Sequence, residues 1–183
     1  MRADPPTPTK LAAHIRRRRR VRDEYWPDAP SVAFDPKGGG WAQVPRTIPL
    51  IATLIDALAA REKPSRVYTA LWLYDYGDGF VELPDLARFT VELGYTTRRG
   101  ERSVTERLQI LEDLGFVRSR PLASRKFGYV LLLDPHQVVA PMRSSPPAQV
   151  SSAWWESWLS AFDARCREAR IRLPEPEVPD VEG

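Results

Sequence analysis

Between residues 80 and 133 the chain carries an order of predicted elements that constrains its fold more than any other feature. Phe80–Glu82 has the pattern of a short strand, and a helix over 84–94 follows, with proline in its first turn and glycine at its end. After a polar turn, apolar residues at helical spacing predict a second helix over 102–114. Two strands joined by a basic loop at 121–126 complete the segment. This order of elements is typical of a winged helix-turn-helix.

Two more helices are predicted before this segment. Apolar residues at helical spacing, with a proline in the first turn, predict a helix over 49–60. Ser65 is a suitable N-cap for a helix over 65–77, whose apolar side chains again share one face. The sequence therefore predicts an α+β fold, a winged helix-turn-helix in which helices pack with a small antiparallel wing sheet.

Proline marks the borders of this folded part. The chain has 183 residues and eighteen prolines, which gather near its two ends and between residues 141 and 147. We therefore predict that the core is followed by a separate C-terminal amphipathic helix. The full division is a disordered basic arm and linker at 1–40, the winged helix-turn-helix domain at 41–140, a linker at 141–151, the C-terminal helix at 152–172 and a disordered acidic tail at 173–183.

Basic charge is concentrated in two parts of the chain. The net charge is only +3, but residues 1–40 carry nine basic and five acidic side chains. Residues 94–126, which include the polar turn, the second helix and the basic loop, carry eight basic and four acidic side chains. Clustered Lys and Arg on one part of a domain are the electrostatic footprint of a nucleic-acid-binding protein.

In a winged helix-turn-helix, the second helix enters the major groove of duplex DNA with its N-terminal residues against the base edges. Arg102 and Gln109 are the candidates for base reading, because arginine pairs with guanine and glutamine with adenine. Glu106 repels phosphate, but it can accept from cytosine or hold Arg102 at i,i+4 spacing. The predicted DNA-binding residues are Thr96, Thr97, Arg98, Arg99, Arg102, Ser103, Glu106, Gln109, Ser124, Arg125 and Lys126.

The N-terminal arm contains a run of five arginines that can add contacts to a polyanion. Like charges repel one another in such a run, so we expect it to become ordered only on its ligand. Runs of this kind also bind RNA or acidic lipid. The predicted auxiliary residues are Arg16, Arg17, Arg18, Arg19 and Arg20.

The C-terminal helix carries an aromatic stripe for which two interpretations stay open. Such stripes pack most often within a protein core, of the same subunit or of a partner. Because a predicted linker isolates this helix, we predict that it binds a partner and can form a homodimer that suits paired half-sites. The predicted partner-binding residues are Trp154, Trp155, Trp158 and Phe162.

Other function classes find little support in the sequence. His14 and His136 are the only histidines, so no histidine-based triad or zinc site can be assembled, and no Walker loop or dinucleotide fingerprint is present. We expect no catalytic residues, no cofactor, no metal and no enzymatic activity. A single cysteine, Cys166, and the lack of a long apolar run or secretory signal favour a cytoplasmic protein that does not bind membranes.

Three pieces of the segment 45–139 carry a resemblance to known proteins: PRTIPLI, DGFVEL and LQILEDLGF. The segment, about half of the chain, resembles a poorly characterised family of bacterial proteins that tend to occur on plasmids and other mobile elements. The resemblance implies a setting in plasmid maintenance, copy-number control, transfer or regulation of neighbouring genes, and it implies no particular activity.

Taken with the fold, this setting predicts a duplex-DNA-binding transcription regulator or maintenance factor of a mobile element. The alternatives are a winged-helix protein–protein interaction module and, more remotely, a plasmid replication initiator.

Overall fold

The structure is a computed structural model that describes residues 8–29, 42–83 and 85–173. It divides into two units, residues 1–41 and 42–183. In the first unit, α1 (Pro8–Tyr25) includes the arginine run, whose side chains are exposed. High helix propensities of arginine and alanine favour this helix, and the expectation that the arm becomes ordered only on a polyanion stays a prediction. Residues 1–7 and 30–40 of the predicted arm and linker lie outside the described residues.

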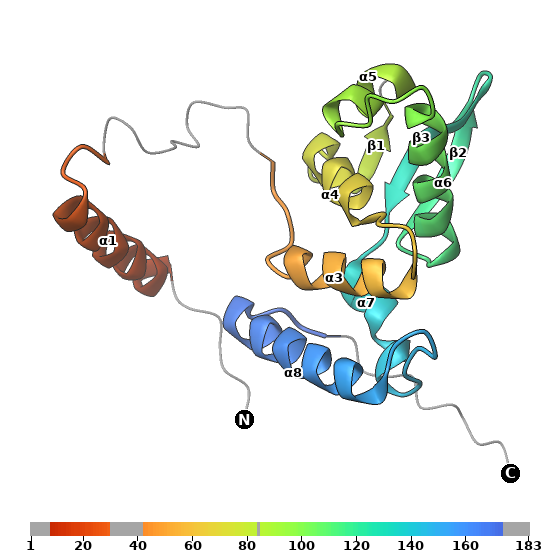
Figure 1. Cartoon of the computed structure of the whole chain (residues 1–183). Helices are drawn as coiled ribbons and strands as arrows, with labels where there is room; N and C mark the ends of the chain where they lie inside the picture. Colours follow the sequence, from red (N-terminus) through yellow and green to blue (C-terminus); the bar gives the residue numbers. More distant parts are fainter. Residues whose placement is uncertain (1–7, 30–41, 84, 174–183) are drawn as a thin grey trace, which may run out of the picture. The chain divides into compact units, whose positions relative to one another are not determined.

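The second unit is an α+β domain, as predicted (Figure 1). Its sheet is antiparallel and three-stranded, with the order β1-β3-β2. Its elements are α3 (Ile48–Leu58), α4 (Ser65–Tyr74), β1 (Phe80–Glu82), α5 (Leu86–Glu92), α6 (Gly100–Asp113), β2 (Val117–Leu122), β3 (Arg125–Leu132), α7 (Pro135–Val139), the 3-10 helix η2 (Pro141–Arg143) and α8 (Ser152–Ala169).

Local interactions set where α5 begins and ends and where α6 begins. The Asp85 carboxylate caps α5 by accepting from the backbone N–H groups of Ala87 and Arg88. Gly94 ends the helix at φ +72°, a left-handed conformation that favours glycine. Gly100 opens α6 so close to the turn that a Cβ atom there would lie 2.2 Å from the Tyr95 carbonyl oxygen. A side chain at position 100 would therefore push α6 away from α5.

The hairpin of β2 and β3 is longer than the sequence predicts. We expected a loop over 121–126, but the strands pair as far as Leu122 and Arg125. Only Ala123 and Ser124 form the turn, with Ala123 at φ +52°. The outer part of the predicted basic loop is therefore mostly strand, which gives its side chains fixed directions.

One hydrophobic core joins the helices of the second unit to the inner face of the sheet. The sheet contributes Val81 and Val130, which are paired across β1 and β3 and are almost fully buried. Apolar side chains from α3, α4, α6 and α8 belong to the same buried cluster, as their helical spacing predicts. The largest fully buried side chains include Tyr68, Phe89, Phe116, Phe162, Ile51, Leu54, Ile55, Leu71, Leu108 and Leu111.

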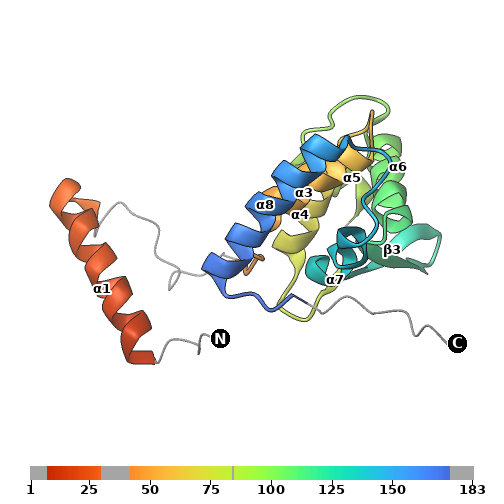
Figure 2. The ribbon, with the colours of Figure 1, turned by 90° about the horizontal axis from the view of Figure 1, so that it is seen from below.

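The prediction of a separate C-terminal helix is wrong. α8 lies beside α3 in both views of the chain (Figures 1 and 2). The indole N–H of Trp158 donates to the Leu50 carbonyl oxygen at 2.9 Å. Trp155, Trp158 and Phe162 are buried in the core of their own chain, and Trp154 is half-buried against it. Trp155, Trp158 and Phe162 are therefore not available to a partner, which corrects their predicted role, whereas Trp154 keeps part of its surface exposed.

Residues 141–151 are also not a free linker. The Arg143 guanidinium makes a two-pronged ion pair with Asp163 on α8, at 2.6 and 3.0 Å. The Ser151 hydroxyl caps α8 by accepting from the Trp154 N–H. Proline density does not mark a linker here, because prolines also suit short turns, and Pro141 begins the 3-10 helix η2. The predicted acidic tail lies outside the described residues from position 174 onward.

The docked position of α8 predicts the reactivity of the single cysteine. Cys166 is 2% exposed, and burial raises the pKa of its thiol. Since the thiolate is the nucleophile, we expect native Cys166 to react with a disulfide reagent at least about 100-fold more slowly than in denaturant. Absorbance of the released thiol measures this, and equal rates in both conditions would show that α8 is not packed.

None of the helices in the described ranges is both long enough and apolar enough to cross a membrane.

Candidate nucleic-acid interface

α6 has one buried side and one exposed side, as its sequence predicts. Val104, Leu108 and Leu111 have no exposed area and contact the core. Solvent-exposed positions on the other side are Glu101, Arg102, Glu106 and Asp113. This face is therefore open to a ligand, but its charges are mixed.

Basic side chains gather at the N-terminal end of this exposed face. Arg98 and Arg99, in the turn before α6, and Arg102, in its first turn, are exposed. Among the residues that the structure describes, Arg98 and Arg99 have no hydrogen-bond or ion-pair partner for their side chains. Thr96 and Thr97 are exposed beside them. Two guanidinium groups and two hydroxyls are thus available to phosphate oxygens.

Arg102 is held by a neighbour. Its Nε donates to Glu106 Oε1 at 2.8 Å, one helical turn away. The two side chains are 79% and 49% exposed, so this pair contributes only about 0.3–0.5 kcal/mol to stability. A stronger ligand for Arg102 can therefore replace Glu106 at little cost.

The basic hairpin is joined to α6 through Gln109. Lys126 Nζ on β3 donates to Gln109 Oε1, and Gln109 Nε2 donates to Asp113 Oδ1 at 2.8 Å. Both ends of the glutamine amide are thus occupied. Gln109 positions Lys126 beside the exposed side of α6. Its two hydrogen bonds, to Lys126 and Asp113, must break before its amide can bind adenine.

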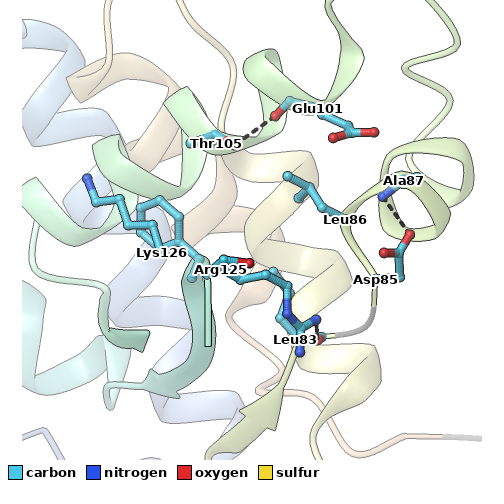
Figure 3. Close-up of a pocket in the computed structure, with 10 residues that line it drawn as sticks. Leu83, Asp85, Leu86, Ala87, Glu101, Thr105, Arg125 and Lys126 are labelled. Atoms are coloured by element: carbon cyan, nitrogen blue, oxygen red, sulfur yellow. Dashed lines mark hydrogen bonds between the residues drawn. The ribbon is translucent and has the colours of Figure 1, made fainter. Parts of the chain in front are cut away.

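A cavity of about 340 Å³ lies between α5, α6 and the β2–β3 turn (Figure 3). Arg125 extends along its floor and donates to the Leu83 carbonyl oxygen at 3.0 Å. The carboxylates of Asp85 and Glu101 belong to the same cavity. Positive and negative groups are balanced there, so the cavity is less suited to phosphate than the Arg98–Arg99 turn.

The structure separates the predicted DNA-binding residues into two sets. Ser103, Gln109 and Arg125 are half-buried, and the last two are held by hydrogen bonds within the domain. The other members of the set are exposed, and they are Thr96, Thr97, Arg98, Arg99, Arg102, Glu106, Ser124 and Lys126.

Two charged residues of α6 have structural roles. Arg107 is 15% exposed, pairs with Glu62 at 2.6 Å and lies 4.9 Å above the Tyr95 ring centre. Glu112 turns toward the sheet and accepts from the backbone N–H and the hydroxyl of Ser119, at 2.8 and 2.7 Å. Neither residue belongs to the exposed face.

Sequence reasoning missed a polar chain formed by Thr47, His136 and Asp134. His136 Nε2 lies 3.0 Å from the Thr47 hydroxyl, and its Nδ1 lies 2.8 Å from Asp134 Oδ1. Hydroxyl, imidazole and carboxylate follow one another in the same order in hydrolase triads. Thr47, however, has no exposed area, so a substrate cannot reach its hydroxyl. These hydrogen bonds instead link the start of α3 to α7, and Thr47 and His136 are 89 positions apart in the sequence.

Comparisons with protein-family models, with curated proteins and with solved structures found no match to this chain. The resemblance of residues 45–139 to a family found on mobile elements therefore stays a prediction.

Proposed function

We propose that this chain binds duplex DNA and that its core is a winged helix-turn-helix, with α6 as the recognition helix and the β2–β3 hairpin as the wing. One observation carries the proposal. Three exposed guanidinium groups, those of Arg98, Arg99 and Arg102, gather at the N-terminal end of an exposed helix, and two of them have no partner in the described part of the chain. In helix-turn-helix proteins this end of the recognition helix meets the base edges.

Each group then has a distinct role. Arg98 and Arg99 bind phosphates on one side of the groove, and Lys126 and Ser124 bind the backbone that the wing reaches. Arg102 reads guanine through its O6 and N7 atoms. Glu106 keeps Arg102 extended before binding, and it either accepts from cytosine N4 or is displaced. The N-terminal end of the α6 dipole adds to the attraction of phosphate.

The arginines of α1 add an electrostatic contribution that does not depend on base sequence. All five, Arg16 to Arg20, are exposed. Each phosphate neutralised by such a side chain releases counterions and strengthens binding at low salt. In the setting that the resemblance implies, the protein is a regulator or maintenance factor of a plasmid or another mobile element.

A second candidate function is binding to a protein partner through the same face. The observation that favours it is the acidic content of the exposed stripe, where Glu101, Glu106 and Asp113 interrupt the basic surface. Such mixed charge suits a protein surface better than a polyanion.

Fluorescence anisotropy with a labelled mixed-sequence duplex tests the proposal. The chain is compared with a variant in which the five arm arginines are alanine, so that the arm and the core are measured separately. We expect this arm-silenced variant to keep binding at low salt, with a logarithmic salt slope of about −3, because Arg98, Arg99 and Lys126 are its three cationic phosphate contacts. The absence of duplex binding by this variant at low salt would leave protein binding as the function of the face.

Glu106→Gln is expected to raise the affinity for mixed-sequence DNA about fivefold, because it removes one negative charge, about 1 kcal/mol of repulsion, from the face. The same anisotropy titration measures the change. Glu156→Gln removes an equal charge from an exposed position of α8 and is expected to change nothing. If the two variants behave alike, Glu106 does not lie close to the DNA.

A further inference from the structure

The outer face of the sheet is left open by the described residues of the second unit. Strand register places Phe80, Leu131 and Arg118 in one row across the three strands. The next row on the same face consists of Glu82, Tyr129 and Arg120. Phe80 is 45% exposed and Leu131 is 41% exposed, and because they are paired across β1 and β3 they form one contiguous apolar strip.

This face has an apolar middle and two oppositely charged edges. The Phe80 and Tyr129 rings stack with centres 5.6 Å apart, and Leu131 continues the apolar strip. Glu82 on β1 and Arg118 on β2 are exposed, and neither has an ion-pair partner among the described residues. In the described part of the second unit, the Arg120 guanidinium donates one long hydrogen bond, 3.4 Å, to the Ser119 carbonyl oxygen.

We propose that a second copy of this chain packs on this face, about a two-fold axis that runs along β3. Rotation about this axis exchanges β1 and β2 but keeps each row in place. Glu82 of each copy then lies opposite Arg120 of the other, and Phe80 lies opposite Arg118, an arrangement that suits an ion pair and a cation–π contact. Tyr129 and Leu131 meet their own symmetry mates at the centre. A two-fold axis perpendicular to the strands would instead place β2 of one copy on β2 of the other, so that the arginines of the two copies would lie opposite each other.

The dimer is weak on its own. Three short strands spaced about 4.8 Å apart offer on the order of 300–400 Å² per copy, compared with roughly 800 Å² in a stable complex. We expect a dissociation constant on the order of 100 µM. The α8 side chains Trp155, Trp158 and Phe162 cannot replace this surface, because they are buried in their own chain. The proposal does not depend on DNA binding, so either one can fail without the other.

Sedimentation equilibrium of the full chain, from about 5 µM to about 1 mM, tests the proposal. The weight-average mass of the wild type should rise toward that of two chains. Glu82→Arg and Arg120→Glu should each keep the mass of one chain, because each places like charges in contact. The two substitutions together restore the opposite charges and should restore the dimer. Glu156→Arg, at an exposed position on α8, is the matched control and should associate like the wild type.

Leu131→Lys gives a second test, because it disrupts the apolar centre without changing a buried residue. It should abolish association while the far-UV circular dichroism stays unchanged. A wild type that keeps the mass of one chain at the highest concentration would overturn the proposal. Equal association of the wild type and both single charge variants would also overturn it. A monomeric wild type that binds a short oligothymidylate, with binding lost in Phe80→Ala, would assign the face to single-stranded nucleic acid instead.

Discussion

Replacement of Phe162 by alanine is expected to lower the free energy of unfolding by about 3–5 kcal/mol. Phe162 has no exposed area and lies in the middle of α8. Its ring stacks on that of Trp158, with centres 4.9 Å apart, and lies 6.0 Å from the ring of His136. Its removal would leave a cavity where α8 meets the helices of the domain, and the neighbouring rings are too rigid to fill it.

Urea unfolding followed by tryptophan fluorescence measures this loss. Ser160→Ala changes an exposed position of the same helix and is the matched control, with an expected change within about 0.5 kcal/mol. A loss below about 1 kcal/mol for Phe162→Ala would mean that α8 contributes little to the fold. That outcome would return the aromatic stripe to the role of a partner-binding surface.

Arg98→Ala with Arg99→Ala is expected to weaken duplex binding about 100-fold at 0.1 M salt and to reduce the magnitude of the logarithmic salt slope by about 2. Both side chains are exposed and have no partner in the described ranges, so their loss should leave the fold unchanged. Because phosphate contacts carry no sequence information, the loss should be similar for every duplex. The measurement uses the variant in which the five arm arginines are alanine, so that DNA binding by α1 does not mask the loss of affinity.

The matched control is Arg46→Ala with Arg167→Ala, which removes two exposed arginines near α8 and the start of α3. It lowers the net charge by the same amount, so it corrects for long-range attraction. Equal losses in the two double variants would show that only net charge matters. In that case the turn before α6 would not be the contact surface.

The part of the fold that the sequence predicts best is the part built from local signals. Helix spacing, the cap at Asp85 and the terminating Gly94 each act within a few residues, so α5 and α6 follow from sequence alone. The docking of α8 does not, since an aromatic stripe has the same pattern whether it packs on its own chain or on a partner. The bond between Thr47 and His136 joins residues 89 positions apart, and no local pattern indicates it.

In the candidate site, too, local features follow from the sequence, whereas long-range contacts do not. Helical spacing predicts an outward face of α6 with Arg102, Ser103, Glu106 and Gln109; Ser103 and Gln109 are half-buried, whereas Arg102 and Glu106 are exposed. Their spacing also predicts the ion pair between them. Arg125 and Gln109 behave differently, because their hydrogen bonds depend on how closely the hairpin approaches α6 and the end of β1. Sequence alone gives no distance between these elements.

Hydrogen–deuterium exchange of the full chain, with and without a duplex at low salt, tests the proposed contact surface most directly. We expect DNA to slow exchange at residues 96–109 and 122–127 while α8 is unchanged. Slowing confined to α1, or no slowing in the second unit, would contradict the proposal that α6 and the β2–β3 hairpin bind DNA.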